Sequence, residues 1–161
     1  MKILYTITKS EIGGAQTHVL QLIEHAVKGG HDVALMGYPG GWLHQKAIEQ
    51  GAVFYPNSFF SNSLNPVKVF RAMRIVKRAV ADFHPDLVHC HSSGAGIVTR
   101  FVVRGRVPTV FTAHSWAFTK GAPFLRKMIA IIFEKIAASF TTKIICVSDF
   151  DRALAYRYRI A

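Results

Sequence analysis

The sequence predicts an α/β domain whose core is a parallel β-sheet. Short apolar runs rich in β-branched residues alternate with longer segments whose apolar residues recur at helical spacing, which is typical of repeated β-α-β units. The apolar runs are nearly continuous, as expected where helices cover both faces of a sheet. With 161 residues the chain is about the size of one domain. We therefore expect one doubly wound, Rossmann-like domain over residues 1–161.

Six apolar runs have the length of buried strands. Pro56 ends the third, because proline cannot donate to the hydrogen-bond ladder of a sheet. The expected strands are Lys2–Ile7, Asp32–Met36, Ala52–Tyr55, Asp86–His91, Pro108–His114 and Lys143–Val147.

The segments after these runs carry the start and stop signals of helices. Gly29-Gly30 ends the first, while Asn65 and Pro66 open the third as N-cap and first helical residue. Ser148 caps the last helix. The expected helices are Ala15–Lys28, Trp42–Gln50, Pro66–Phe83, Gly94–Val103, Pro123–Phe140 and a segment beginning at Asp149.

The composition excludes several classes of protein. Half of the residues are hydrophobic, which excludes intrinsic disorder, and no apolar run approaches the roughly 20 residues of a membrane span. Cys90 and Cys146 lie in apolar strands, where thiols are inert, and two cysteines fit a reducing compartment such as the cytoplasm. The net charge of +11 suggests nucleic acid or an anionic membrane as partner. Because the basic segment 66–83 lacks interleaved exposed aromatic residues and the sequence contains no nucleic-acid motif, we expect no nucleic acid.

The loop after the first strand, T-K-S-E-I-G-G-A, is a candidate phosphate site. Gly13 and Gly14 keep side chains away from the start of a helix, where backbone N–H groups and the helix dipole favour an anion. A phosphate or diphosphate ligand is one interpretation, and a tight turn without a ligand is the other. The dinucleotide fingerprint G-x-G-x-x-G and the P-loop are both absent from the sequence.

Three histidines lie at the ends of neighbouring strands. Strand alternation places His89 and His91 on one face, and His114 ends the next strand at a comparable height. Such imidazoles can bind zinc, act as acid or base, or orient hydroxyl and phosphate groups. We interpret His89 as a core residue bonded to backbone, and His91 and His114 as lying nearer the rim. Because these loops contain few carboxylates, we expect no metal.

The segment 66–83 is amphipathic, with a basic outer face that suits an anionic membrane. The basic residues of that face include Lys68, Arg71, Arg74 and Arg78.

The segment 123–140 has apolar residues over about half of its circumference, with Glu134 among the charged residues that flank them. Three interpretations of this apolar surface are open: the helix packs inside the domain, it meets a second domain, or it lies shallowly in a bilayer. Aromatic residues near the strand ends suggest an interface in the same region. They are Phe59, Phe60, Trp116 and Phe118.

Taken together, the motifs resemble the N-terminal domain of retaining GT-B glycosyltransferases of glycosyltransferase family 4. The resemblance rests on S-E-I-G-G-A-Q-T-H, G-H-D-V, H-P-D-L-V-H-C-H-S-S, P-T-V-F-T-A-H-S and I-I-C-V-S-D-F, in this order. It implies transfer of a sugar from a nucleotide-diphosphate sugar to an acceptor, with the anomeric configuration retained. In such enzymes the N-terminal domain mainly holds the acceptor.

The resemblance also assigns roles to individual residues. Gly13 and Gly14 would approach the donor diphosphate, and His114 would lie beside the transferred sugar as the catalytic residue. The residues implied to line the acceptor cleft are His91, Ser92, Ser115 and Ser148. No cofactor is implied other than the donor substrate.

A second Rossmann-like domain, which would hold the nucleotide sugar, has no counterpart in residues 1–161. We therefore expect this domain alone to be inactive. Family members that build lipopolysaccharide and other surface polysaccharides use membrane-bound acceptors, which implies a cytoplasmic domain attached to the inner face of the plasma membrane. Two alternatives stay open: another GT-B enzyme such as a nucleotide-sugar epimerase, and a non-enzymatic basic module that binds anions.

Overall fold

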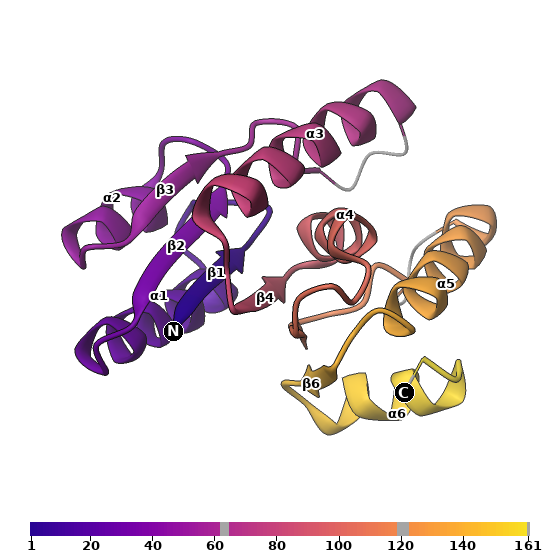
Figure 1. Cartoon of the computed structure of the whole chain (residues 1–161). Coiled ribbons are helices and arrows are strands. Elements are labelled where there is room, and N and C mark those ends of the chain that lie inside the picture. The colour runs from indigo at the N-terminus through magenta and orange to yellow at the C-terminus, as the bar shows by residue number, and fades with distance from the viewer. Residues whose placement is uncertain (62–64, 119–122, 161) are drawn as a thin grey trace.

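The computed structural model describes residues 1–61, 65–118 and 123–160. Within these ranges a six-stranded sheet has the order β3-β2-β1-β4-β5-β6, and every pairing is parallel (Figure 1). This confirms the doubly wound, Rossmann-like prediction. The strands are β1 (Lys2–Thr6), β2 (Asp32–Gly37), β3 (Val53–Pro56), β4 (Leu87–His91), β5 (Thr109–Ala113) and β6 (Lys143–Cys146).

The helices begin and end within two residues of the sequence prediction where it gave both ends. Asn65 caps its helix as expected, since its Oδ1 accepts hydrogen bonds from the backbone N–H groups of Val67 and Lys68 at 3.0 and 3.3 Å. The helices are α1 (Gly14–Lys28), α2 (Trp42–Glu49), α3 (Pro66–Phe83), α4 (Ser93–Val103), α5 (Phe124–Ala138) and α6 (Asp149–Arg157).

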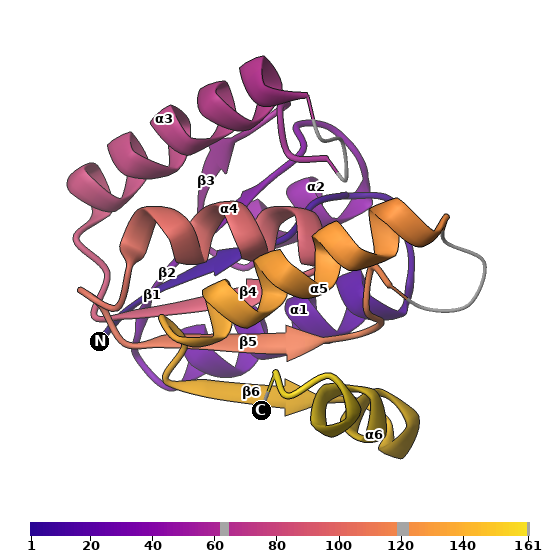
Figure 2. The same cartoon turned by 90° about the vertical axis from the view of Figure 1, so that its right-hand side faces the viewer.

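Two hydrophobic cores lie on opposite faces of the sheet. On one face α1 and α2 pack against alternate residues of β1 and β2, such as Tyr5 and Leu35. On the other face α3, α4 and α5 lie side by side (Figure 2) and pack against Leu4, Met36 and Phe111. Side chains of successive strand residues therefore enter different cores, which explains why the strands are apolar at nearly every position.

The chain reverses its direction of winding between β1 and β4, which are neighbours in the sheet. The connection from β1 enters α1 on one face, while β4 leads into α4 on the other. In open α/β sheets, ligands bind outside the carboxyl ends of strands at such a switch point. The histidines predicted from the sequence lie at this place.

The aromatic residues expected at an interface belong to the core instead, so that prediction is wrong. Trp116 and Phe118 are each 1% exposed and Phe60 is 3% exposed. Trp116 stacks on Phe118 with ring centroids 5.3 Å apart, and its Nε1 donates to the backbone carbonyl of Asp151 at 2.9 Å. These rings fill the space between the end of β5 and α6.

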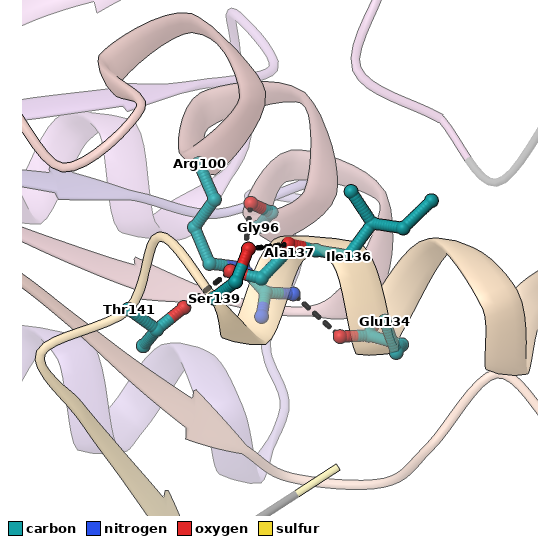
Figure 3. A network of polar contacts seen from close by, with 7 residues as sticks. All are labelled: Gly96, Arg100, Glu134, Ile136, Ala137, Ser139 and Thr141. Carbon is teal, nitrogen blue, oxygen red and sulfur yellow. Dashed lines mark hydrogen bonds and ion pairs between the residues drawn. The ribbon is translucent and has the colours of Figure 1, made fainter.

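The prediction for Glu134, which was expected on the charged border of α5, is also wrong. It is fully buried and pairs with the equally buried Arg100 of α4, with Nη2 and Oε2 2.6 Å apart (Figure 3). Arg100 Nε also donates to the carbonyl of Gly96 at 3.0 Å, and the guanidinium lies over the Phe111 ring. Glu134 can be buried because Arg100 supplies a counter-charge and a hydrogen bond, which replace the hydration that the carboxylate loses.

The outer surfaces of α3 and α5 differ in character. Lys68, Arg71, Arg74 and Arg78 are exposed, as predicted, while Val76 on the opposite side of α3 is buried. Phe70, which lies between Lys68 and Arg71 in the sequence, is also exposed, so the expectation that this helix has no exposed aromatic residue is wrong. On α5 several large apolar residues remain exposed. They are Phe124, Leu125, Met128, Ile132, Phe133 and Ile136. Across the described ranges, no helix combines the length and apolarity needed to cross a bilayer.

Candidate functional site

Three imidazoles from different elements meet at the switch point. His18 comes from α1, His91 from the last residue of β4 and His114 from the residue after β5. The ring of His18 lies 5.8 Å from that of His91 and 5.3 Å from that of His114, measured between centroids. The register of β4 and β5, with His91 paired to Thr112, brings His91 and His114 to the same end of the sheet.

His91 forms the centre of this cluster. Its Nδ1 lies 3.1 Å from Nε2 of His114, a hydrogen bond in which one ring donates and the other accepts. His91 has no exposed surface, whereas His114 is half-buried. The expectation that His91 lies near the exposed rim is therefore wrong, because the rings of His18 and His114 both pack against it.

His89 lies one layer below the cluster, with its ring 4.3 Å from that of His91. It is a core residue, as predicted, but its partner is a side chain: His89 Nε2 is 2.8 Å from the hydroxyl of Thr112. The sequence expected a backbone partner. Tyr5, whose ring is 5.6 Å from that of His89, completes the apolar floor.

Burial keeps these histidines neutral. Desolvation, helped by the neighbouring imidazoles, lowers the pKa of His89 to about 4 and lowers the pKa of His91 well below its usual value. Burial also lowers the pKa of His114, although the negative charge of Asp151 partly opposes this shift. At neutral pH the rings can therefore both donate and accept hydrogen bonds to a ligand.

The glycine loop opens α1 beside the cluster. Gly13 is extended, with φ 179°, and an added Cβ at Gly14 would meet no described atom within 4 Å. No side chain of the described residues caps this helix, so its first backbone N–H groups are available to an anion. His18 follows Gly14 by four residues, about 6 Å along the helix. An anion at the loop would therefore lie near the histidines.

The serines expected to bind the acceptor occupy different positions. Ser92 follows His91 directly and has a positive φ of 65°, and Ser115 is exposed immediately after His114. Ser148 Oγ accepts from the backbone N–H of Asp151 at 3.1 Å and donates to its carboxylate at 2.6 Å, which confirms its capping role. Their contacts with an acceptor stay predictions.

An apolar cavity of about 440 Å³ adjoins these residues. It is bordered by Ser93 and Gly94, which follow Ser92, and by Ala117, which follows Ser115 by two residues. Side chains of α3, α4 and α5 form its walls, with Arg126 among the lining residues. A ligand at the end of β4 thus has an apolar hollow beside it.

Sequence reasoning missed two members of the site, His18 and Thr112. His18 was visible as the last letter of S-E-I-G-G-A-Q-T-H, and its position one turn into α1 was the available signal. Thr112 has no signal in the sequence, because its role depends on the register of β4 and β5. Cys90 is buried, which raises its pKa to about 11 and agrees with an inert thiol.

Comparison with known proteins assigns the family. Residues 12–161 match the sequence model of Glycosyltransferase Family 4. The chain belongs to this family. The family 4 match includes the glycine loop from Gly13 onward and all three histidines of the cluster.

Individual family 4 relatives are longer than this chain. It is 27% identical over 152 residues to the O-antigen biosynthesis glycosyltransferase WbnH of Escherichia coli, covering 94% of this chain and 43% of WbnH. It is 25% identical over 159 residues to the UDP-Gal:α-D-GlcNAc-diphosphoundecaprenol α-1,3-galactosyltransferase of the same species, covering 98% and 41% respectively. The chain therefore spans about two fifths of the curated relatives it matches.

Solved structures agree on the fold. The crystal structure of a glycosyltransferase from Rickettsia africae superposes with a TM-score of 0.75 at 18% identity, covering 99% of this chain and 40% of that one. This likeness confirms that the chain has the architecture of one half of a GT-B glycosyltransferase.

Proposed function

We propose that this chain is the acceptor-side domain of a retaining glycosyltransferase. The enzyme moves a sugar from a nucleotide-diphosphate sugar to a cell-surface polysaccharide or lipid-linked acceptor. The observation that carries the proposal is the position of His114. Its ring lies half-buried at the strand-switch crevice of a family 4 domain, hydrogen-bonded to His91 and close to the helix that opens at Gly14.

In this proposal His114 is the catalytic residue that contacts the transferred sugar. A neutral imidazole can bond a sugar hydroxyl and fix the sugar for reaction, which lowers the barrier by orientation. His91, which has no exposed surface, acts through His114 by holding its ring. Ser92 and Ser115, which directly follow the two histidines in the sequence, contact the acceptor.

The Gly13-Gly14 loop receives the donor diphosphate in this proposal. The open space at Gly14 and the uncapped start of α1 support this role. The nucleotide itself is held mainly by a second domain, so residues 1–161 alone are inactive. The galactosyltransferase relative, whose name contains UDP-Gal, supports a nucleotide-sugar donor.

A lipid-linked acceptor suits the surfaces around the site. The name of the same relative contains GlcNAc-diphosphoundecaprenol, a lipid-linked sugar. Here the apolar cavity adjoins the acceptor residues, α5 exposes large apolar side chains and α3 presents basic ones. This combination supports peripheral attachment to an anionic membrane on the cytoplasmic side.

Titration followed by amide NMR shifts tests the division of labour. A soluble GlcNAc-diphosphate-lipid analogue is expected to shift Ser92, His114 and Ser115, while UDP binds weakly and shifts only the loop at Gly14. Ser115→Ala, which removes a proposed acceptor contact, should weaken acceptor binding, and the exposed His25→Ala on α1 serves as control. Tight UDP binding would contradict the proposal and make the glycine loop the primary nucleotide site.

Two further outcomes address the alternatives. An epimerase would convert the nucleotide sugar without any acceptor, so the full-length enzyme incubated with donor alone would yield an isomerised donor. A basic anion-binding module would bind DNA or polyanions with steep salt dependence and show no saturable shifts at His114. Either result would replace the transferase proposal.

A further inference from the structure

The apolar cavity and the first turn of α4 meet at Ser93 and Gly94, which belong to both. We propose that together they bind a phosphate ester of a long hydrocarbon chain. The phosphate binds at the start of α4, and the first part of the chain fills the cavity. This lipid-phosphate site rests on the proposed function, because it receives the part of a lipid-linked acceptor that is not sugar.

The first turn of α4 offers backbone N–H groups to an anion. Ser92, the N-cap residue, makes no side-chain bond to the helix. The N–H of Ala95 donates to the hydroxyl of Thr8 at 3.1 Å. Among the described residues, no such bond satisfies the N–H groups of Ser93 and Gly94. Two adjacent N–H groups at the positive end of a helix dipole favour a phosphate.

A buried hydroxyl without a partner points to a ligand at the same place. Ser93 is only 7% exposed and lines the cavity. Its Oγ has no hydrogen-bond partner among the described residues, although it lies close enough to Glu134 to oppose the rise that burial causes in the pKa of that carboxyl. Buried polar atoms almost always have a partner. The Ser93 hydroxyl can donate to an oxygen of a phosphate bound at this turn.

The charges around the first turn of α4 also favour a phosphate. Arg126 of α5 is the only charged residue among the described residues that line the cavity, and it is exposed. A guanidinium binds phosphate oxygens through charge-assisted hydrogen bonds. Glu134 is paired with Arg100 at 2.6 Å, so its negative charge is offset and does not repel an anion at Ser93.

The walls of the cavity suit a hydrocarbon rather than a sugar. Its volume of about 440 Å³ is that of a small-molecule site. A sugar ring would leave hydroxyl groups without partners against apolar walls, whereas a hydrocarbon chain gains free energy by burial. The walls come from α3, α4 and α5, which lie side by side (Figure 2). Their apolar residues include Val69, Ile97, Val98, Ile129, Ala130 and Phe133.

The cavity is continuous with the exposed apolar surface of α5. Phe133 lines the cavity and is also 41% exposed. Ile132 and Ile136, its neighbours on α5, are exposed as well. A chain longer than the cavity can therefore leave it along α5 without placing hydrocarbon in water.

Calorimetric titration of the chain with three probes tests the site: farnesyl diphosphate, farnesol and inorganic pyrophosphate. We expect one farnesyl diphosphate per chain, bound roughly tenfold or more tightly than either other probe, because only this probe has both a phosphate and a hydrocarbon chain. Affinity for pyrophosphate equal to that for farnesyl diphosphate would indicate a site for free phosphate and overturn the proposal. Equal affinity for farnesol, or no saturable binding of farnesyl diphosphate, would also overturn it.

Variants locate the two parts of the site. Ser93→Ala and Arg126→Gln should each weaken farnesyl diphosphate binding by roughly fivefold or more, since hydrogen bonds to a charged group are strong. Ala130→Leu narrows the cavity and should weaken farnesyl diphosphate binding without changing pyrophosphate binding. The controls Ser139→Ala and Lys135→Gln make the same polar changes at exposed positions that do not line the cavity. Equal losses in variants and controls would place the ligand elsewhere.

Circular dichroism confirms that each variant is folded, and the two polar variants decide the outcome if Ala130→Leu does not fold. The three probes contain no sugar, so failure of the lipid-phosphate site is distinguishable from failure of the proposed function. Acceptor binding that depends on Ser115, without farnesyl diphosphate binding, would overturn the lipid-phosphate site alone. Failure of both titrations would overturn the proposed function as well.

Discussion

Arg100 and Glu134 form a salt bridge 2.6 Å long in which neither side chain is exposed. The bridge joins α4 to α5, and Arg100 also bonds the carbonyl of Gly96 on its own helix. Burial raises the pKa of Glu134, while Arg100 opposes that shift. The pair therefore fixes the packing of two helices whose residues line the cavity beside the candidate site.

Removing one partner of this bridge should be costly. Glu134→Gln leaves the Arg100 guanidinium buried without a counter-charge, which is expected to lower the free energy of unfolding by about 3–5 kcal/mol. The double variant Arg100→Met/Glu134→Leu should lose much less, because it removes both charges. Urea denaturation measures the stability of both variants, and the double variant remains informative if Glu134→Gln does not fold.

The control is Glu49→Gln, which breaks the exposed pair with Lys46 and should lower the free energy of unfolding by less than about 1 kcal/mol. Equal costs for Glu134→Gln and Glu49→Gln would contradict this account.

The fold was predictable because its signals are local, and the Arg100–Glu134 pair was not. Apolar runs, glycine stops and the Asn65 cap each depend on a few neighbouring residues, and the structure confirms them. Arg100 and Glu134 are 34 positions apart, and on a helix a lone acid beside apolar residues normally faces water. The sequence therefore placed Glu134 outside, as it placed Trp116 at an interface.

The candidate site was predictable in part for the same reason. Fold logic identified the strand ends that carry His91 and His114, since ligands bind at that edge of a parallel sheet. The burial of His91 depends on His18, which arrives from α1, and the bond of His89 depends on the register with Thr112. Contacts between segments that are distant in the sequence leave no periodic pattern of residues, so the sequence does not predict them.

Acid should destabilise the domain through its buried histidines. The pKa of His89 is about 4 in the folded state and about 6.5 in an unfolded chain, so the unfolded state binds more protons between these values. The stabilising contribution is complete above pH 6.5 and is lost as pH falls to 4. For His89 it amounts to at most about 3 kcal/mol, and His91 acts in the same direction.

The variant His89→Asn should therefore flatten the dependence of stability on pH between 4 and 6.5. Urea midpoints measured in metal-free buffer at several pH values test this. The exposed His25→Asn should keep the wild-type slope, which controls for the loss of a histidine as such. An unchanged slope in His89→Asn would show that His89 does not carry the acid sensitivity.

Backbone strain at Ser92 predicts that a glycine variant is more stable than an alanine variant at this position. Ser92 has φ 65° and ψ 140°, a conformation that glycine adopts at no steric cost, and in the described structure its side chain makes no capping bond. Ser92→Gly is expected to raise the free energy of unfolding by about 1 kcal/mol relative to Ser92→Ala. Both variants lack the hydroxyl, so thermal melts of the pair isolate the backbone. A glycine variant no more stable than the alanine variant would contradict strain at this turn.

The basic face of α3 should direct binding to anionic membranes. Arg74 and Arg78 are exposed on α3, and each basic residue near an anionic surface contributes about 1 kcal/mol. Arg74→Gln/Arg78→Gln should therefore lower the affinity for phosphatidylglycerol vesicles at low salt, measured by co-sedimentation, by roughly tenfold or more, and higher salt should release the wild-type chain.

The matched control Lys28→Gln/Lys143→Gln removes the same charge from exposed sites outside α3 and α5 and should have a smaller effect. Equal losses would attribute binding to the net charge of +11 rather than to α3. Absence of wild-type binding at low salt would contradict the membrane proposal. Low salt is the condition under which a basic helix beside exposed apolar residues binds an anionic membrane most strongly.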